Sequence, residues 1–226
     1  MSKIKWDIIP PEIKNDTFYY SIINLIKNSS EIKNILEIGA SSGSGSTEAF
    51  IIGKMKKNIK LFSIEVCTER FDLLKNRYTF DSNFFPYNVS SVGIDEFPEK
   101  KKIIDFHNNI KTTLNNYPIN MVLGWYDNDI EYITKNNIPQ NGIELIKKEN
   151  NIDVFDCVLI DGSEFTGMAE YNHIKGAKYI LLDDINAFKT YDVNKLLKSD
   201  PTYECLVEDY SVRNGFSIYK KINKNI

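Results

Sequence analysis

Three glycines follow a short apolar segment near the start of the chain, in the sequence NILEIGASSGSGST. Gly39, Gly43 and Gly45 come directly after residues 35–38, a run that is the right length for a buried parallel strand. Glycine tolerates positive φ and lets the backbone approach a ligand closely, and a helix beginning at about Ser46 would direct free N–H groups into the loop. The pattern predicts a nucleotide-cofactor loop at the carboxyl edge of a sheet, with a ligand-free strand-to-helix turn as the alternative.

A second apolar segment, KLFSIE at residues 60–65, ends in an acid. Glu65 lies 20 residues after Gly45, the spacing at which a carboxylate binds the two hydroxyls of an adenosine ribose. S-adenosylmethionine and NAD both contain this ribose. The spacing therefore indicates an adenosine cofactor without separating the two.

Two stretches of sequence carry a resemblance to a known family. The string ILEIGASSGSG resembles the glycine-rich first motif of class I S-adenosylmethionine-dependent methyltransferases, and SIEVCTERF resembles their second motif. Glu37 holds the acidic position two residues before the first glycine that is typical of that loop. The resemblance implies that S-adenosylmethionine is the cofactor, that Glu65 binds its ribose and that the loop surrounds its methionine part. The implied cofactor-binding residues in and before the loop are Glu37, Gly39, Ala40, Ser41, Gly43 and Gly45.

Carboxylates follow two later apolar segments, FDCVLIDGSEF and YILLDDIN. Because parallel strands end at one edge of a sheet, we expect Asp161, Asp183 and Asp184 to converge beside the reactive end of the cofactor. Carboxylates that share one place raise one another's pKa unless a cation joins them, and oxygen ligands suit Mg²⁺ or Mn²⁺. Such a metal could lower the pKa of an acceptor hydroxyl. Alternatively, Asp161 caps the following turn and the other two acids hold loop N–H groups.

A closer resemblance is to the macrocin O-methyltransferase type. It rests on an acid–glycine pair after the fourth expected strand, a double acid after the fifth and the Gly-Trp pair in LGWYDND. Enzymes of that type use Mg²⁺ to methylate sugar hydroxyls of natural products and surface glycans. The resemblance implies that Asp161, Asp183 and Asp184 bind the metal, with Asp161 also beside the cofactor. It further implies that Trp125 or Tyr126 lies near the adenine.

The general base is less well defined by the sequence. Relatives of the macrocin type often carry an Asp two residues after the first metal-binding acid, where this chain has Ser163 followed by Glu164. The chain contains only two histidines, His107 and His173. The candidate catalytic residues are therefore Asp161, Glu164 and His173.

The elements that must position these residues are strands alternating with helices. Strands are expected at residues 34–38, 60–65, 120–124, 155–161, 179–183, 203–209 and 215–221. The last two form a hairpin across the turn at Asn214 and Gly215. The expected fold is α/β, with a doubly wound, mostly parallel, Rossmann-like seven-stranded sheet and an antiparallel C-terminal hairpin.

The chain length suits a single domain over residues 1–226. Residues 1–33 read as an N-terminal helical segment. Residues 70–119 are far longer than one crossover helix needs, which predicts an insertion that covers the substrate as a lid, with an extra packing element as the alternative.

Composition and net charge limit the kinds of partner and the cellular location that we expect for this protein. The net charge of −3 and pI of about 5.6 argue against nucleic acid and a membrane surface as partners. Three widely spaced cysteines, no long apolar stretch and no signal peptide predict a cytoplasmic protein with reduced thiols. The sequence leaves open whether the chain forms a homo-oligomer.

The predicted function is O-methyl transfer from S-adenosylmethionine to a hydroxyl of a small polar acceptor, a sugar or nucleotide sugar of surface-glycan or natural-product biosynthesis. Mg²⁺ or Mn²⁺ would assist if the acids bind a metal. The alternative is an NAD(P)-dependent oxidoreductase of the short-chain dehydrogenase type, because Tyr171 and Lys175 match its Tyr-x-x-x-Lys pattern. Val158 stands where that family has a Ser, which weakens this alternative. A fold of the methyltransferase type that binds without catalysis is the third reading.

Overall fold

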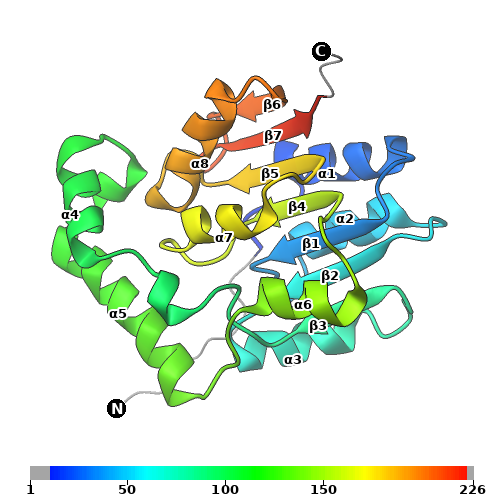
Figure 1. Cartoon of the computed structure of the whole chain (residues 1–226), viewed down its shortest axis with the longest axis horizontal. Helices are drawn as coiled ribbons and strands as arrows, with labels where there is room; N and C mark the ends of the chain where they lie inside the picture. The colour runs from blue at the N-terminus through cyan, green and yellow to red at the C-terminus, as the bar shows by residue number, and fades with distance from the viewer. Residues whose placement is uncertain (1–10, 223–226) are drawn as a thin grey trace.

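A computed structural model describes residues 11–222 and shows one mixed sheet between two layers of helices (Figure 1). The strand order is β3-β2-β1-β4-β5-β7-β6. The pairings among β3, β2, β1, β4 and β5 are parallel, whereas β7 runs antiparallel between β5 and β6. This confirms the expected fold class, including the antiparallel C-terminal hairpin. The strands are β1 (Asn34–Ile38), β2 (Lys60–Ile64), β3 (Phe84–Tyr87), β4 (Cys157–Ile160), β5 (Tyr179–Asp183), β6 (Tyr203–Asp209) and β7 (Phe216–Lys221).

The central strands are apolar on both sides because helices cover both faces of the sheet. In β4, Cys157 and Leu159 belong to the core with α1, α2 and α3, and Val158 and Ile160 belong to the core with α6, α7 and α8. The helices are α1 (Thr17–Asn28), α2 (Ser46–Lys54), α3 (Thr68–Arg77), α4 (Lys100–Asn109), α5 (Ile119–Lys135), α6 (Gly142–Asn150), α7 (Gly167–Ile174) and α8 (Phe188–Ser199). Two 3₁₀ turns, Ile94–Glu96 and Thr113–Asn116, connect the segments around α4.

The expected strand at residues 120–124 is wrong. This segment begins α5, a helix of 17 residues that buries Val122 and Ile133 and exposes most of its charged residues. The true third strand is β3, which lies inside the range 70–119 that was expected to be an insertion. That range therefore contains most of α3 and an edge strand of the sheet in addition to α4.

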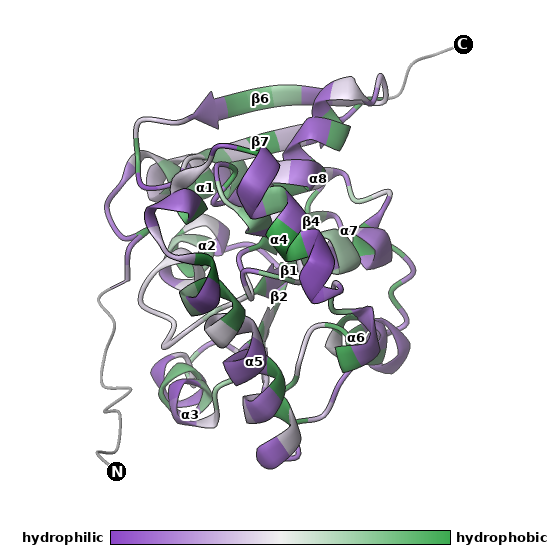
Figure 2. Cartoon of the chain, turned by 90° about the vertical axis from the view of Figure 1, so that its left-hand side faces the viewer, coloured by the Kyte–Doolittle hydropathy of each residue, from purple (hydrophilic) through white to green (hydrophobic). Residues whose placement is uncertain are grey.

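Helices α4 and α5 lie beside the carboxyl ends of β1, β2 and β5, at the left of Figure 1. Figure 2 views this edge directly and shows the two helices in front of the sheet, with hydrophilic and hydrophobic stretches alternating along α5. Helix α4 belongs to the expected range, whereas α5 begins at its last residue, and a lid over a substrate stays a prediction.

Within residues 11–222, no helix combines the length and the apolar character needed to cross a bilayer.

Candidate functional site

A cavity of about 1070 Å³ opens at the carboxyl edge of the sheet. Its wall combines the loop after β1, the ends of β2, β4 and β5, and the inner face of α5. The structure thus brings together at one cavity most of the residues singled out in the sequence: Gly39, Ala40, Ser41, Gly45, Glu65, Trp125, Asp161, Glu164, Asp183 and Asp184.

Gly39 is the tightest point of the glycine loop. Its φ is +91°, and a Cβ at this position would lie 2.0 Å from the carbonyl oxygen of Asp161. The N–H groups of Gly39 and Ala40 both donate to the carbonyl oxygen of Ile64, at 3.0 Å each. The loop therefore passes directly over the ends of β2 and β4, and no side chain fits at its first turn.

Gly43 does not line the cavity but packs against α3. A Cβ there would lie 2.7 Å from Cδ1 of Leu74, and the Tyr78 hydroxyl donates to the Gly43 carbonyl oxygen. This glycine therefore fixes the loop onto α3. The cavity is lined instead by the other loop residues, Gly39, Ala40, Ser41 and Gly45.

Glu37 lies beneath the loop and is fully buried. Its carboxylate accepts hydrogen bonds from the hydroxyls of Ser46 (2.6 Å), Thr47 (2.9 Å) and Ser63 (2.6 Å). Burial raises the pKa of Glu37 despite these three donors. Glu37 does not line the cavity. Its three hydrogen bonds instead tie β1 to β2 and to the first turn of α2.

Glu65 is buried in the cavity wall directly after β2. One carboxylate oxygen accepts from the backbone N–H of Ser41 at 2.8 Å, and the other accepts from the backbone N–H of Cys67 at 2.7 Å. Burial raises the pKa of Glu65, while these donors and the charge of Arg70 act in the opposite direction. Two backbone donors on separate loops therefore hold this side chain in one orientation.

The three acids converge as expected. One carboxylate oxygen from each of Asp161, Asp183 and Asp184 lies within 4.8 Å of the others. The backbone helps to bring them together, because Asp184 adopts a left-handed conformation with φ of +56° directly after β5.

Lys189, which the sequence analysis did not identify, already supplies a positive charge to two of these acids. Its Nζ lies 2.9 Å from Oδ1 of Asp161 and 2.7 Å from Oδ2 of Asp184. Arg213 contacts the third acid, Asp183, through its guanidinium. Asn214 Nδ2 donates to the remaining oxygen of Asp184 at 3.0 Å.

A divalent ion does not fit the acids in this arrangement. Mg²⁺ needs near-octahedral oxygen ligands at about 2.0–2.1 Å, but the Lys189 ammonium lies between the carboxylates of Asp161 and Asp184, where it would repel a second cation. Burial would raise the pKa of Asp184, yet Lys189 and Asn214 lower it overall. The cation that the clustered acids require is thus provided by side chains.

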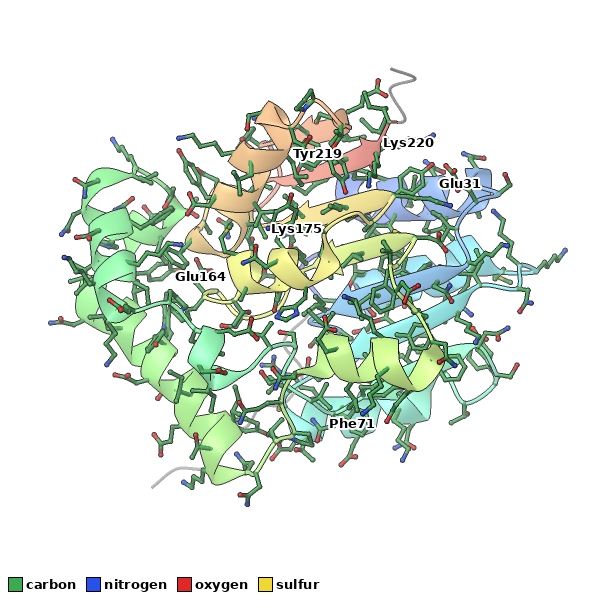
Figure 3. The ribbon with its side chains drawn as sticks, viewed as in Figure 1. Glu31, Phe71, Glu164, Lys175, Tyr219 and Lys220 are labelled. Atoms are coloured by element: carbon green, nitrogen blue, oxygen red, sulfur yellow. The ribbon has the colours of Figure 1, made fainter. Side chains whose placement is uncertain are left out.

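Glu164 lies before the start of α7, on the side of α4 and α5 (Figure 3). One carboxylate oxygen accepts from the backbone N–H of Lys189 at 3.3 Å, and the residue lines the cavity. Burial raises the pKa of Glu164 to about 7, although the charge of Lys189 acts against this.

This raised pKa predicts a pH dependence of stability. Because the folded pKa of Glu164 exceeds its unfolded value, the folded chain retains a proton that the unfolded chain releases, so stability falls as pH rises from about 4 through about 7. Between about pH 5.5 and about pH 8, we expect the free energy of unfolding to fall in the wild type by about 1–2 kcal/mol more than in Glu164→Gln. Urea unfolding at both pH values measures this difference. Equal losses in the two proteins would contradict the assignment.

The two histidines lie away from the cavity wall. His173, on α7, has Nε2 2.7 Å from Glu96 and Nδ1 3.0 Å from Glu144, so both ring nitrogens have carboxylate partners. His107, on α4, has Nε2 3.0 Å from the carbonyl oxygen of Tyr117. The structure therefore does not bring His173 to Asp161 and Glu164.

The two aromatic residues expected near the adenine, Trp125 and Tyr126, both lie on α5 but in different surroundings. Trp125 lines the cavity and packs edge-on against Tyr117, with ring centroids 4.9 Å apart. Tyr126 lies outside the wall, and its hydroxyl donates to the carbonyl oxygen of Pro98 at 2.9 Å.

Asp129, on α5, is a further acidic residue that lines the cavity. Asp129 accepts a hydrogen bond from the Ser163 hydroxyl at 2.5 Å, which ties α5 to the loop after β4. Burial raises the pKa of Asp129. The sequence did not predict Asp129 at the site, because its contact with Ser163 joins residues 34 positions apart.

Tyr171 and Lys175 do not face the cavity. Tyr171 is buried in the core, and the Lys175 ammonium lies 5.5 Å from the centroid of its ring. Figure 3 shows Lys175 farther than Glu164 from the carboxyl edge. The pair that motivated the dehydrogenase reading is therefore not placed to transfer a proton to a ligand at this site.

No protein-family model and no curated protein sequence matches this chain. Among solved structures, an O-methyltransferase from Bacillus cereus in complex with SAH gives a TM-score of 0.54 over 94% of this chain and 84% of that chain, at 13% identity. A methyltransferase from Geobacter sulfurreducens gives a TM-score of 0.54 over 93% of this chain and 81% of that chain, at 8% identity. At these identities the likeness concerns the fold. The chain thus has the Rossmann-like α/β fold of these methyltransferase structures.

Proposed function

We propose that this chain is an S-adenosylmethionine-dependent O-methyltransferase. The observation that carries the proposal is Glu65, a buried carboxylate fixed by two backbone N–H groups in the cavity wall beside the glycine loop. Each oxygen keeps a lone pair that can accept a hydrogen bond from a ribose hydroxyl. The fold supports the choice of cofactor, since the Bacillus cereus enzyme of the same fold binds SAH.

We further propose that the acceptor is a small polar molecule with a free hydroxyl, a sugar or a nucleotide sugar. The cavity is slightly larger than the volumes typical of ligand pockets, which leaves room for an acceptor beside the cofactor. Its wall on the side of α5 combines the aromatic rings of Trp125 and Phe97 with the polar groups of Asn128 and Asp129. Rings that pack against an apolar face, together with hydrogen-bonding groups, suit a sugar.

When bound, S-adenosylmethionine supplies an electrophilic methyl group. The chain's own contribution is to hold an acceptor hydroxyl in line with that group and to take up its proton. Asp161 and Glu164 are the candidates for proton uptake, because both line the cavity and burial raises the pKa of each to about 7. His173 is not included because it lies away from the cavity wall, and metal assistance is not included because Lys189 and Arg213 already pair with the acids.

Calorimetric titration tests the choice of cofactor. We expect S-adenosylhomocysteine to bind at one site per chain and NADH to give no binding heat. Binding of NADH alone would overturn the proposal in favour of an oxidoreductase. With the cofactor settled, transfer of a radiolabelled methyl group to a panel of glycosides and nucleotide sugars would identify the acceptor class.

A further inference from the structure

The ammonium group of Lys189 is an enclosed positive charge in the wall of the cavity. The residue is only 8% exposed, although a lysine side chain is rarely buried without partners. Burial would lower the pKa of Lys189, but Asp161 and Asp184 raise it well above its usual value, so the group carries a positive charge. Its position in the second residue of α8 also brings that charge to a helix N-terminus, where the helix dipole disfavours cations. The two carboxylates must offset both costs.

The backbone of Lys189 is fixed as firmly as its side chain. A Cβ on Gly167 would lie 1.8 Å from the Lys189 carbonyl oxygen, so α7 and α8 approach each other closely at this point. The Lys189 N–H donates to Glu164, and the neighbouring Thr190 hydroxyl donates to the carbonyl oxygen of Asp183. The start of α8 is therefore held against the ends of β4 and β5, with little freedom for the ammonium to move away.

We propose that Lys189 is a positioning residue that supplies the fixed positive charge among Asp161, Asp183 and Asp184 in place of a divalent metal ion. It orients the carboxylate of Asp161 in the cavity wall and prevents the three acids from binding a divalent cation from solution. Methyl transfer by this chain then requires no metal, a consequence that rests on the proposed function. The exclusion of cations from the acidic cluster does not depend on that function.

A titration with Mn²⁺ alone tests the proposal without any knowledge of the acceptor. Free hydrated Mn²⁺ has an electron paramagnetic resonance signal that is lost on binding, so binding can be followed directly on the full chain. We expect the wild type to leave the signal unchanged, with and without S-adenosylhomocysteine. Lys189→Met removes the charge but keeps the length of the side chain. It should bind one Mn²⁺ at least about tenfold more tightly than the wild type, because the carboxylates of Asp161 and Asp184 are then released from the ammonium and can act as ligands.

Two further variants make the comparison specific. Lys195→Met changes an exposed lysine of the same helix and should behave as the wild type. Lys189→Arg keeps the positive charge and should also fail to bind Mn²⁺. Circular dichroism confirms that each variant is folded before its titration.

The outcomes separate clearly. Binding of one Mn²⁺ to the wild type that is abolished by Asp184→Asn would overturn the proposal, as would a folded Lys189→Met chain that gains no affinity. If Lys189→Met does not fold, the wild type and Lys189→Arg decide the question by the same criterion. Failure of S-adenosylhomocysteine to bind would overturn the proposed function instead, and it leaves the Mn²⁺ result unaffected.

Discussion

Glu65→Gln should weaken the binding of S-adenosylhomocysteine by about 10- to 100-fold, which corresponds to the loss of about 1.5–3 kcal/mol for hydrogen bonds to a charged group. The substitution preserves the size of the side chain but turns one oxygen into an NH₂ group. Because Ser41 and Cys67 each direct a backbone N–H at this carboxylate, the NH₂ group must face one of these donors. The variant therefore loses both an acceptor for the ribose and one of the contacts that orient the side chain. Isothermal calorimetry measures the affinity.

Glu204→Gln is the matched control, since Glu204 is exposed on β6, a strand that contributes nothing to the cavity wall. It makes the same chemical change without touching the site and should bind the cofactor product with unchanged affinity. A folded Glu65→Gln chain with wild-type affinity would remove the observation on which the proposed function rests.

The glycine loop and the acid after β2 could be predicted because their signals are local. The strands at residues 34–38, 179–183 and 203–209 were predicted with the bounds that the structure shows. β1 and β5 are apolar runs whose local preference agrees with their buried positions in the sheet, whereas β6 is a mostly exposed edge strand. The convergence of the acids at strand ends followed from parallel topology alone.

The third strand was misplaced because its sequence is weak as a strand. β3 consists of FFPY, and its proline suits only an edge position, where one side of the backbone needs no partner. The apolar residues at 120–124 mimic a short strand, but they continue into the amphipathic pattern of α5 over 17 residues. The helix period becomes clear only when the longer window is read.

Lys189 and Asp129 could not have been predicted from local sequence. Lys189 reaches Asp161 across 28 positions and Asp129 reaches Ser163 across 34. In a chain with many lysines, the one that is buried against carboxylates is identified only by tertiary packing. The predicted clustering of acids did indicate that a cation lies nearby, since carboxylates buried together require one. It did not indicate that a lysine provides it.

The glycine loop itself yields the second large expected effect. Gly39→Ala should destabilise the chain by about 2–6 kcal/mol, combining about 1–3 kcal/mol for a non-glycine residue at positive φ with about 1–3 kcal/mol for overpacking. The new methyl group would lie 2.0 Å from the carbonyl oxygen of Asp161, so the loop or the end of β4 must move. The Asp161 N–H also donates to the Ile38 carbonyl oxygen at 3.0 Å, so this movement disturbs the pairing of β1 with β4. Urea unfolding measures the loss of stability.

Gly124→Ala is the control that separates the local clash from a general effect of replacing glycine. A Cβ on Gly124 meets no atom within 4 Å, and the residue lies inside α5, where alanine is favoured over glycine by about 0.5–1 kcal/mol. This variant should therefore be slightly more stable than the wild type. Because Gly39 joins the glycine loop to the backbone of Asp161, the proposed function predicts that a folded Gly39→Ala chain also binds S-adenosylhomocysteine more weakly, whereas Gly124→Ala should not. Equal stability and affinity in the two variants would show that the close approach at Gly39 does not hold the loop in place.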